Sequence, residues 1–135
     1  MSSILRISGE SLDIDALLSQ YSIPTDCVWK KGEPRVLKRE FHSDSGANFL
    51  ASDADFDEFD RQVSEATEFL ELHAPVIAKI VTFPGVQNAV LDFGVSIYEG
   101  HIAQFSYLPP RLIQLAANAG IGVEISHYAC SEAEV

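Results

Sequence analysis

The chain has 135 residues, of which 47% are hydrophobic and 21% are charged, and its formal net charge is -11. A chain of this length and composition folds around one core, so a single globular domain is predicted over residues 1–135. The negative charge argues against binding to nucleic acid or to an anionic membrane, because both would repel the chain, whereas it would attract a basic partner.

The first residues predict a strand followed by a helix. Residues 4–8 are mostly apolar and predict the strand, and Gly9 ends it. Small polar and acidic residues at 11–13 are typical of a helix start, and leucines then recur at helical spacing up to Tyr21. Pro24 ends this helix, because proline disfavours a helical conformation in the residue before it.

A loop and a β-hairpin are predicted next. The loop runs through Trp29 and Gly32, and residues 35–41 then alternate between two faces, as a half-exposed strand does. Residues 43–46 have the composition of a turn, and residues 47–51 return as the second strand of the hairpin.

The longest helix is predicted after this hairpin, with Ser52 or Asp53 as its cap. Pro75 suits the first position of a separate, shorter helix over residues 76–81. Apolar residues and one histidine, spaced three or four apart, form one buried stripe along the longest helix: Phe56, Phe59, Val63, Ala66, Leu70 and His73.

The last third of the chain predicts two paired strands, a helix and a final strand. The turn at residues 99–100 would lead into a partner strand over residues 101–107. A helix over residues 111–119 and a strand over residues 121–128 follow, and residues 131–135 are a predicted flexible tail. The strand before the turn directs four residues to the core: Leu91, Phe93, Val95 and Ile97.

These elements indicate an α+β fold with an antiparallel or mixed sheet and helices on one face, because only one face of each helix is apolar. The order β-α-β-β-α-β occurs within the chain, so the preferred topology is a ferredoxin-like core with an added hairpin.

No motif in the sequence nominates an enzyme or a cofactor. There is no nucleophile elbow, no phosphate-binding glycine loop and no dinucleotide fingerprint, so neither a catalytic residue nor a cofactor is predicted. The histidines lack the convergent spacing of a zinc site: His42, His73, His101 and His127.

Residues 53–60 partly match a calcium site, because Asp53, Asp55 and Asp57 alternate as in an EF-hand loop. The pattern then fails, since that loop requires glycine and glutamate where this chain has Glu58 and Ser64. No metal site is therefore predicted.

The predicted location is the cytoplasm. The first residues lack a signal-peptide pattern, and no run of eighteen apolar residues occurs. Cys27 and Cys130 lie far apart without a CxxC spacing, so they are predicted to be reduced thiols, and small buried hydrophobic residues in the fold.

The stretches "ILRISGESLDIDALL", "YSIPT", "VWKKGE" and "LAANAGIGVEISHY" resemble a small bacterial family known as domain of unknown function 4279. The resemblance covers nearly the whole chain. It implies an uncharacterised small protein and supplies no catalytic residue.

Most of the basic residues lie close together in the sequence. Trp29 would anchor this segment on the core, and Gly32 would allow its turn. The basic residues are predicted to pair with the acidic helix of residues 53–71; a basic ridge that faces an outside partner is the alternative. Five of the nine fall within ten positions: Lys30, Lys31, Arg35, Lys38 and Arg39.

The leading functional hypothesis is a protein-interaction module, for example an immunity-type protein that masks a basic toxin. The proposed interaction surface is acidic: Asp57, Asp60, Glu65, Glu68 and Glu71. The next candidate is a recognition loop: Trp29, Lys30, Lys31 and Arg35. The alternative is a small-ligand-binding protein or enzyme with a pocket between sheet and helices, formed by His101, His127, Asp92 or Tyr107.

Overall fold

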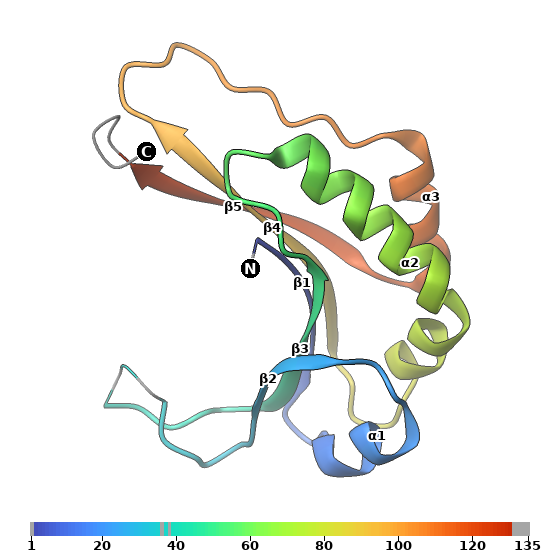
Figure 1. Ribbon diagram of the computed structural model, residues 1–135. Coiled ribbons are helices and arrows are strands. Elements are labelled where there is room, and N and C mark those ends of the chain that lie inside the picture. The colour runs from blue at the N-terminus through green and yellow to red at the C-terminus, as the bar shows by residue number, and fades with distance from the viewer. Residues whose placement is uncertain (1, 36, 38, 131–135) are drawn as a thin grey trace.

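The computed structural model describes residues 2–35, 37 and 39–130 (Figure 1). Valine and lysine at positions 36 and 38, and the predicted flexible tail over residues 131–135, lie outside the described residues. The elements follow in the order β1 (Ser3–Gly9), α1 (Ile14–Gln20), β2 (Thr25–Trp29), β3 (Ser45–Ser52), α2 (Phe59–Val81), β4 (Asn88–Tyr98), α3 (Pro110–Ala119) and β5 (Gly122–Cys130).

The strands form one five-stranded mixed sheet in the order β2-β3-β1-β4-β5. β1 is antiparallel to both of its neighbours, and β2 is antiparallel to β3. The first four strands with α1 and α2 therefore have the ferredoxin-like arrangement, and the predicted α+β class and core topology are confirmed. The addition to this core is not a hairpin: α3 leads into β5, which lies parallel to β4.

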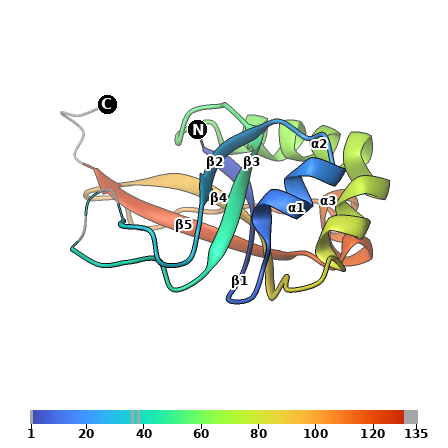
Figure 2. The same cartoon turned by 90° about the horizontal axis from the view of Figure 1, so that it is seen from below.

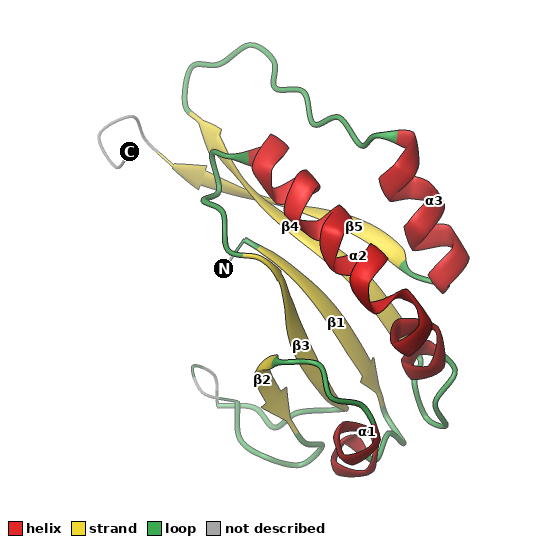
Figure 3. Cartoon of the chain, turned by 45° about the vertical axis from the view of Figure 1, so that its right-hand side comes forward, coloured by secondary structure: helices red, strands yellow, loops and turns green. Residues whose placement is uncertain are grey.

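All three helices contribute to one core on one side of the sheet. α2 and α3 lie side by side there, as Figures 1 and 3 show. Leu17 of α1, Leu70 of α2 and Leu112 of α3 are all buried in the same hydrophobic cluster. The other face of the sheet, called the open face below, has no described helix on it (Figure 2).

The predicted core strand is confirmed over most of its length. Leu91, Phe93 and Val95 are buried, and Phe93 packs edge-on against Phe59 with ring centroids 5.5 Å apart. Ile97 is 38% exposed, because β1 begins opposite Phe93 and the rest of β4 extends beyond it.

The first hairpin differs from its prediction. Its first strand is β2, which the sequence placed in a loop, and the predicted strand over residues 35–41 is wrong for its described part. Only Pro34 and Phe41 form an isolated bridge there. The described residues between 30 and 44 instead form a lobe, called the lobe of residues 30–44 below, that closes on itself through backbone hydrogen bonds, such as Gly32 N–H to the His42 carbonyl at 2.9 Å.

The long helix begins later and ends later than predicted. Its cap is Glu58, not Ser52 or Asp53, so Phe56 lies outside the helix and is 42% exposed. The separate helix over residues 76–81 is also wrong, because α2 continues through Pro75. Ile77 and Ile80 extend the buried face of the helix beyond Pro75, and this packing offsets the backbone hydrogen bond that proline cannot donate.

The predicted partner strand over residues 101–107 is absent, and this segment is irregular and exposed. β5 takes the neighbouring position on β4, with Val123 opposite Leu91 and Ile125 opposite Phe93. None of the described helices is long and apolar enough to cross a membrane.

Candidate binding surfaces

The open face carries a charged network at its centre. Alternation along β1 and β4 directs Leu5 and Leu91 to the core and Arg6 and Asp92 to the open face. The Arg6 guanidinium donates to Asp92 Oδ2 at 3.3 Å and to Glu124 Oε2 at 2.7 Å, while Ser126 Oγ donates to Asp92 Oδ1 at 2.7 Å. Burial disfavours the charged form of Arg6, but the bonds with Glu124 and Asp92 outweigh it and raise the pKa of the guanidinium.

The cavities formed by described residues include two that open on this face. The smaller, about 180 Å³, is called the open-face pocket and lies between Ser2, Ile4, Asp26, Asn48, Phe56, Asp92, Gly94 and Tyr128. The larger, about 360 Å³, lies beside the lobe of residues 30–44 and is lined by Arg6, Trp29, Arg35, His42, Ser43 and Asp44. Sequence reasoning missed both. The smaller takes its walls from all five strands, and the larger combines Arg6 of β1 and Trp29 of β2 with residues of the lobe, so neither can be read from neighbouring positions in the sequence.

In the predicted recognition loop, the Trp29 side chain is held by contacts within the chain. Trp29 Nε1 donates to Asp44 Oδ1 at 2.9 Å, and the indole stacks on His42 with centroids 6.1 Å apart. Gly32 has a φ of 89°, so the predicted role of glycine in this turn is confirmed. Trp29 lies over Gly46 of β3, where an added Cβ would come within 2.5 Å of the indole.

The described basic residues of this segment form no ion pair with the acidic helix, contrary to the prediction, and Lys38 lies outside the described residues. Lys30 Nζ lies 2.6 Å from Asp15 of α1, and this hydrogen bond raises the pKa of Lys30. Arg35 Nη1 lies 3.9 Å from Glu40 within the same lobe. The prediction is wrong because the lobe leaves the sheet at β2, whereas α2 packs against β3, β1, β4 and α3.

The predicted acidic surface of α2 is partly neutralised within the molecule. Glu65 accepts hydrogen bonds from Ser52 Oγ at 2.7 Å and from Arg61 Nε at 3.1 Å. Glu71 accepts from Arg111 Nε of α3 at 2.9 Å. The other three acids are exposed and form no ion pair with a described residue: Asp57, Asp60 and Glu68.

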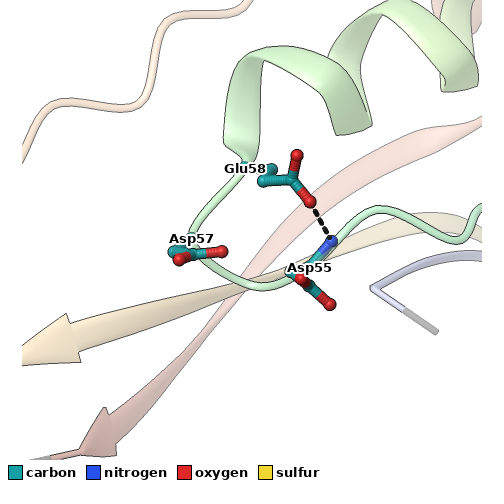
Figure 4. Close-up of side chains that lie close together, drawn as sticks. All are labelled: Asp55, Asp57 and Glu58. Carbon is teal, nitrogen blue, oxygen red and sulfur yellow. Dashed lines mark hydrogen bonds between the residues drawn. The ribbon is translucent and has the colours of Figure 1, made fainter. Parts of the chain in front are cut away.

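The turn before α2 concentrates further negative charge. Carboxylate oxygens of Asp55, Asp57 and Glu58 lie within 4.8 Å of one another, and Glu58 Oε1 accepts from the Asp55 backbone N–H at 3.1 Å (Figure 4). Acidic groups before a helix are stabilised by its dipole without an ion, so this geometry does not by itself argue for a metal. The residues Asp55, Asp57, Glu58 and Asp60 are called the acidic end below.

Glu65 is expected to make stability depend on pH. The hydrogen bond from Ser52, together with Arg61, lowers the pKa of Glu65 below its ordinary value of 4.5. A lowered folded-state pKa contributes stability that is present above the unfolded pKa and is lost as pH falls through the folded pKa. Glu65→Gln should therefore lower Tm near neutral pH, and the difference from the native chain should shrink below about pH 4.

Thermal unfolding at a series of pH values tests this expectation. Glu68→Gln is the matched control, because Glu68 lies on the same helix, is exposed and has no ion pair with a described residue. A Tm difference for Glu65→Gln that is the same at neutral and at acidic pH would contradict the expectation.

The alternative site proposed between sheet and helices does not assemble. Asp92 points to the open face, while His127 lies opposite the core residue Val95 and so alternates to the other face. His101 lines a different cavity, beside Phe56, and Tyr107 is 69% exposed. The two cysteines also differ from their prediction as buried residues, since both are free but Cys27 is exposed and Cys130 is half-buried.

These features define an α+β domain with a ferredoxin-like core, an open sheet face and an acidic end. The family model named domain of unknown function DUF4279 matches residues 1–130, and the chain belongs to that family. No match was found among curated proteins or among solved structures.

Proposed function

We propose that this chain is a protein-interaction module that binds a basic partner, as a cytoplasmic bacterial immunity-type protein that masks a basic toxin would. The proposal rests on the exposed negative charge of the acidic end and of α2. Asp57 and Asp60 of the acidic end and Glu68 of α2 are exposed and have no counter-ion among the described residues. Within the acidic end, Glu58 is paired with Arg61 at 3.6 Å, so Asp57 and Asp60 are acids there that a partner would meet without a counter-ion from the described part of the chain.

The net charge of -11 supports the same function. A basic partner would be attracted from all directions, and exposed acids without internal partners would form its first contacts. Glu65 and Glu71 contribute less to this surface than the sequence suggested, because Arg61 and Arg111 already neutralise them. The proposed contact surface therefore does not include every acidic residue of the helix.

Binding to the products of the neighbouring genes tests the function. A basic product should bind at low ionic strength and dissociate at high ionic strength, because salt screens exposed charges. Failure of every basic product to bind at low salt would contradict the proposal.

Removal of charge from the acidic end should slow association with that partner. Asp57→Asn combined with Asp60→Asn is expected to lower the association rate about threefold or more at low salt and to weaken its salt dependence, without disturbing the core. Stopped-flow mixing at two ionic strengths measures both effects.

Glu10→Gln combined with Glu33→Gln is the matched control for this charge removal. It changes the net charge by the same amount, but Glu10 follows β1 at its far end and Glu33 lies in the lobe of residues 30–44. Equal slowing by both double variants would show that total charge matters and that the acidic end is not the contact surface.

A small-ligand-binding protein or enzyme is the alternative, and one observation favours it. The cavity of about 360 Å³ places Arg35 and His42 beside the indole of Trp29, which suits the anionic group of a small ligand. The Asp44 carboxylate in the same wall is hydrogen-bonded to Trp29 Nε1. A small anion that raises Tm independently of salt would favour this alternative over the basic partner.

A further inference from the structure

We propose that the open-face pocket binds one cationic side chain, an arginine or lysine, of the basic partner, and this inference rests on the proposed function. The volume of about 180 Å³ is below the roughly 300 Å³ at which pockets for whole small molecules begin. A single long side chain is an occupant of suitable size.

The charge of the pocket favours a cation. Asp92 lies in its wall and shares Arg6 with Glu124, so two carboxylates face one guanidinium. Asp26 adds a third carboxylate from β2, and it is exposed and forms no ion pair with a described residue. The described acids and base of this region therefore leave an excess of negative charge, which an incoming ammonium or guanidinium group would reduce.

An unused hydrogen-bond acceptor lies in the same wall. Asn48 Oδ1 is buried and accepts no hydrogen bond from any described residue. Buried polar atoms are nearly always paired, because an unmade hydrogen bond costs free energy. A guanidinium or ammonium group brings several N–H donors and no acceptor, so its chemistry matches the carboxylates and this oxygen.

Aromatic rings form one side of the pocket. Phe56 and Tyr128 lie with ring centroids 5.4 Å apart, and both remain substantially exposed at 42% and 53%. Phe56 lies directly on β4 because residue 94 is glycine: an added Cβ would come within 2.6 Å of Phe56 Cε1. The Phe56 carbonyl accepts from Ser96 N–H at 3.1 Å, which fixes this segment against the strand. Aromatic faces attract organic cations.

The pocket adjoins the acidic end. The ring of Phe56 lines the pocket, and its two neighbours in the sequence, Asp55 and Asp57, belong to the acidic end. A metal ion fits the pocket less well, because the one set of three ligand atoms within 4.8 Å among the described residues is that of the acidic end, not Asp26 with Asp92. A partner that covers the acidic end can therefore place a side chain in the pocket.

An NMR titration with N-acetyl-arginine methylamide tests the pocket directly. The expected result is a set of chemical-shift changes confined to Asp26, the Asn48 side-chain amide, Gly94 and Tyr128. N-acetyl-norleucine methylamide, which has a similar length and no charge, should cause no such changes. Equal shifts with both compounds, or none with the arginine compound, would overturn the inference.

Variants and free arginine make the test specific. Asp26→Asn should weaken binding of the arginine compound about fivefold or more, whereas Glu33→Gln, which also removes one exposed charge near β2, should leave it unchanged. Tyr128→Ala should weaken it as well. Unchanged binding by both pocket variants would overturn the inference, and tighter binding of free arginine would assign the pocket to a small molecule and overturn it too.

Different results would contradict the pocket inference and the proposed function. If a basic partner binds with salt-dependent association but Asp26→Asn does not speed its dissociation, the pocket inference is wrong and the proposed function stands. If the arginine compound binds in the pocket while no basic partner binds, the proposed function is wrong, and the pocket is then not a site for a partner's side chain.

Discussion

Phe93→Ala is expected to lower the free energy of unfolding by about 3–5 kcal/mol, which is the usual cost of truncating a buried phenylalanine. Phe93 is fully buried on β4, between the sheet and the helices, and its ring contacts Phe59 of α2. The truncation would leave a cavity at the contact between the central strands and the longest helix. Urea denaturation gives the value.

Ile97→Ala is the control for this truncation. Ile97 lies on the same strand but is 38% exposed, so its truncation should cost well under half as much. Equal costs for the two variants, or an unchanged midpoint for Phe93→Ala, would remove β4 from the centre of the core.

Gly9→Ala is expected to destabilise the fold by about 3 kcal/mol or more, since it forces backbone to move. An added Cβ at Gly9 would lie 1.8 Å from the Gly85 carbonyl oxygen, and both are fixed where the end of β1 meets the turn before β4. Gln87 N–H donates to the Ser8 carbonyl at 2.9 Å in the same place, so the two segments cannot simply separate.

Gly122→Ala is the matched control for the crowding at Gly9. The nearest atom to an added Cβ at Gly122 lies at 3.9 Å, which is an ordinary contact. Its denaturation midpoint should stay close to that of the native chain. A similar midpoint for Gly9→Ala would contradict the close approach of these two turns.

Much of the fold could be predicted because its signals are local. Asp13, one of the residues predicted at the start of the first helix, caps α1 by accepting a hydrogen bond from Ala16 N–H, and Gly120 directly after the predicted helix ends α3 in a left-handed conformation at φ 76°. The alternation of Leu91, Phe93 and Val95 identified β4 because a sheet covered on one face requires period two.

The errors arose where tertiary contacts outweigh local signals. β2 is a short edge strand with four exposed residues, so no alternation marked it. The alternating polar and apolar residues at 35–41 resembled a strand without having a long partner. Pro75 suggested a helix boundary, but burial of Ile77 and Ile80 carries α2 through it.

The candidate surfaces depended still more on tertiary structure. The identity of the acidic residues on α2 was evident, but Arg111 lies 40 residues from Glu71, and nothing local shows that it neutralises that carboxylate. The open-face pocket takes Asp26, Asn48 and Asp92 from three different strands. Only the strand order and register bring them together.

Amide hydrogen exchange of this chain, alone and bound to its basic partner, tests the central claim most directly. We predict slower exchange on binding in residues 54–61, in β4 around Gly94 and in β5 near Tyr128, because these segments form the acidic end and part of the open-face pocket. Slower exchange confined to residues 30–44, with no change at the acidic end, would contradict it and place the partner on the Trp29 lobe.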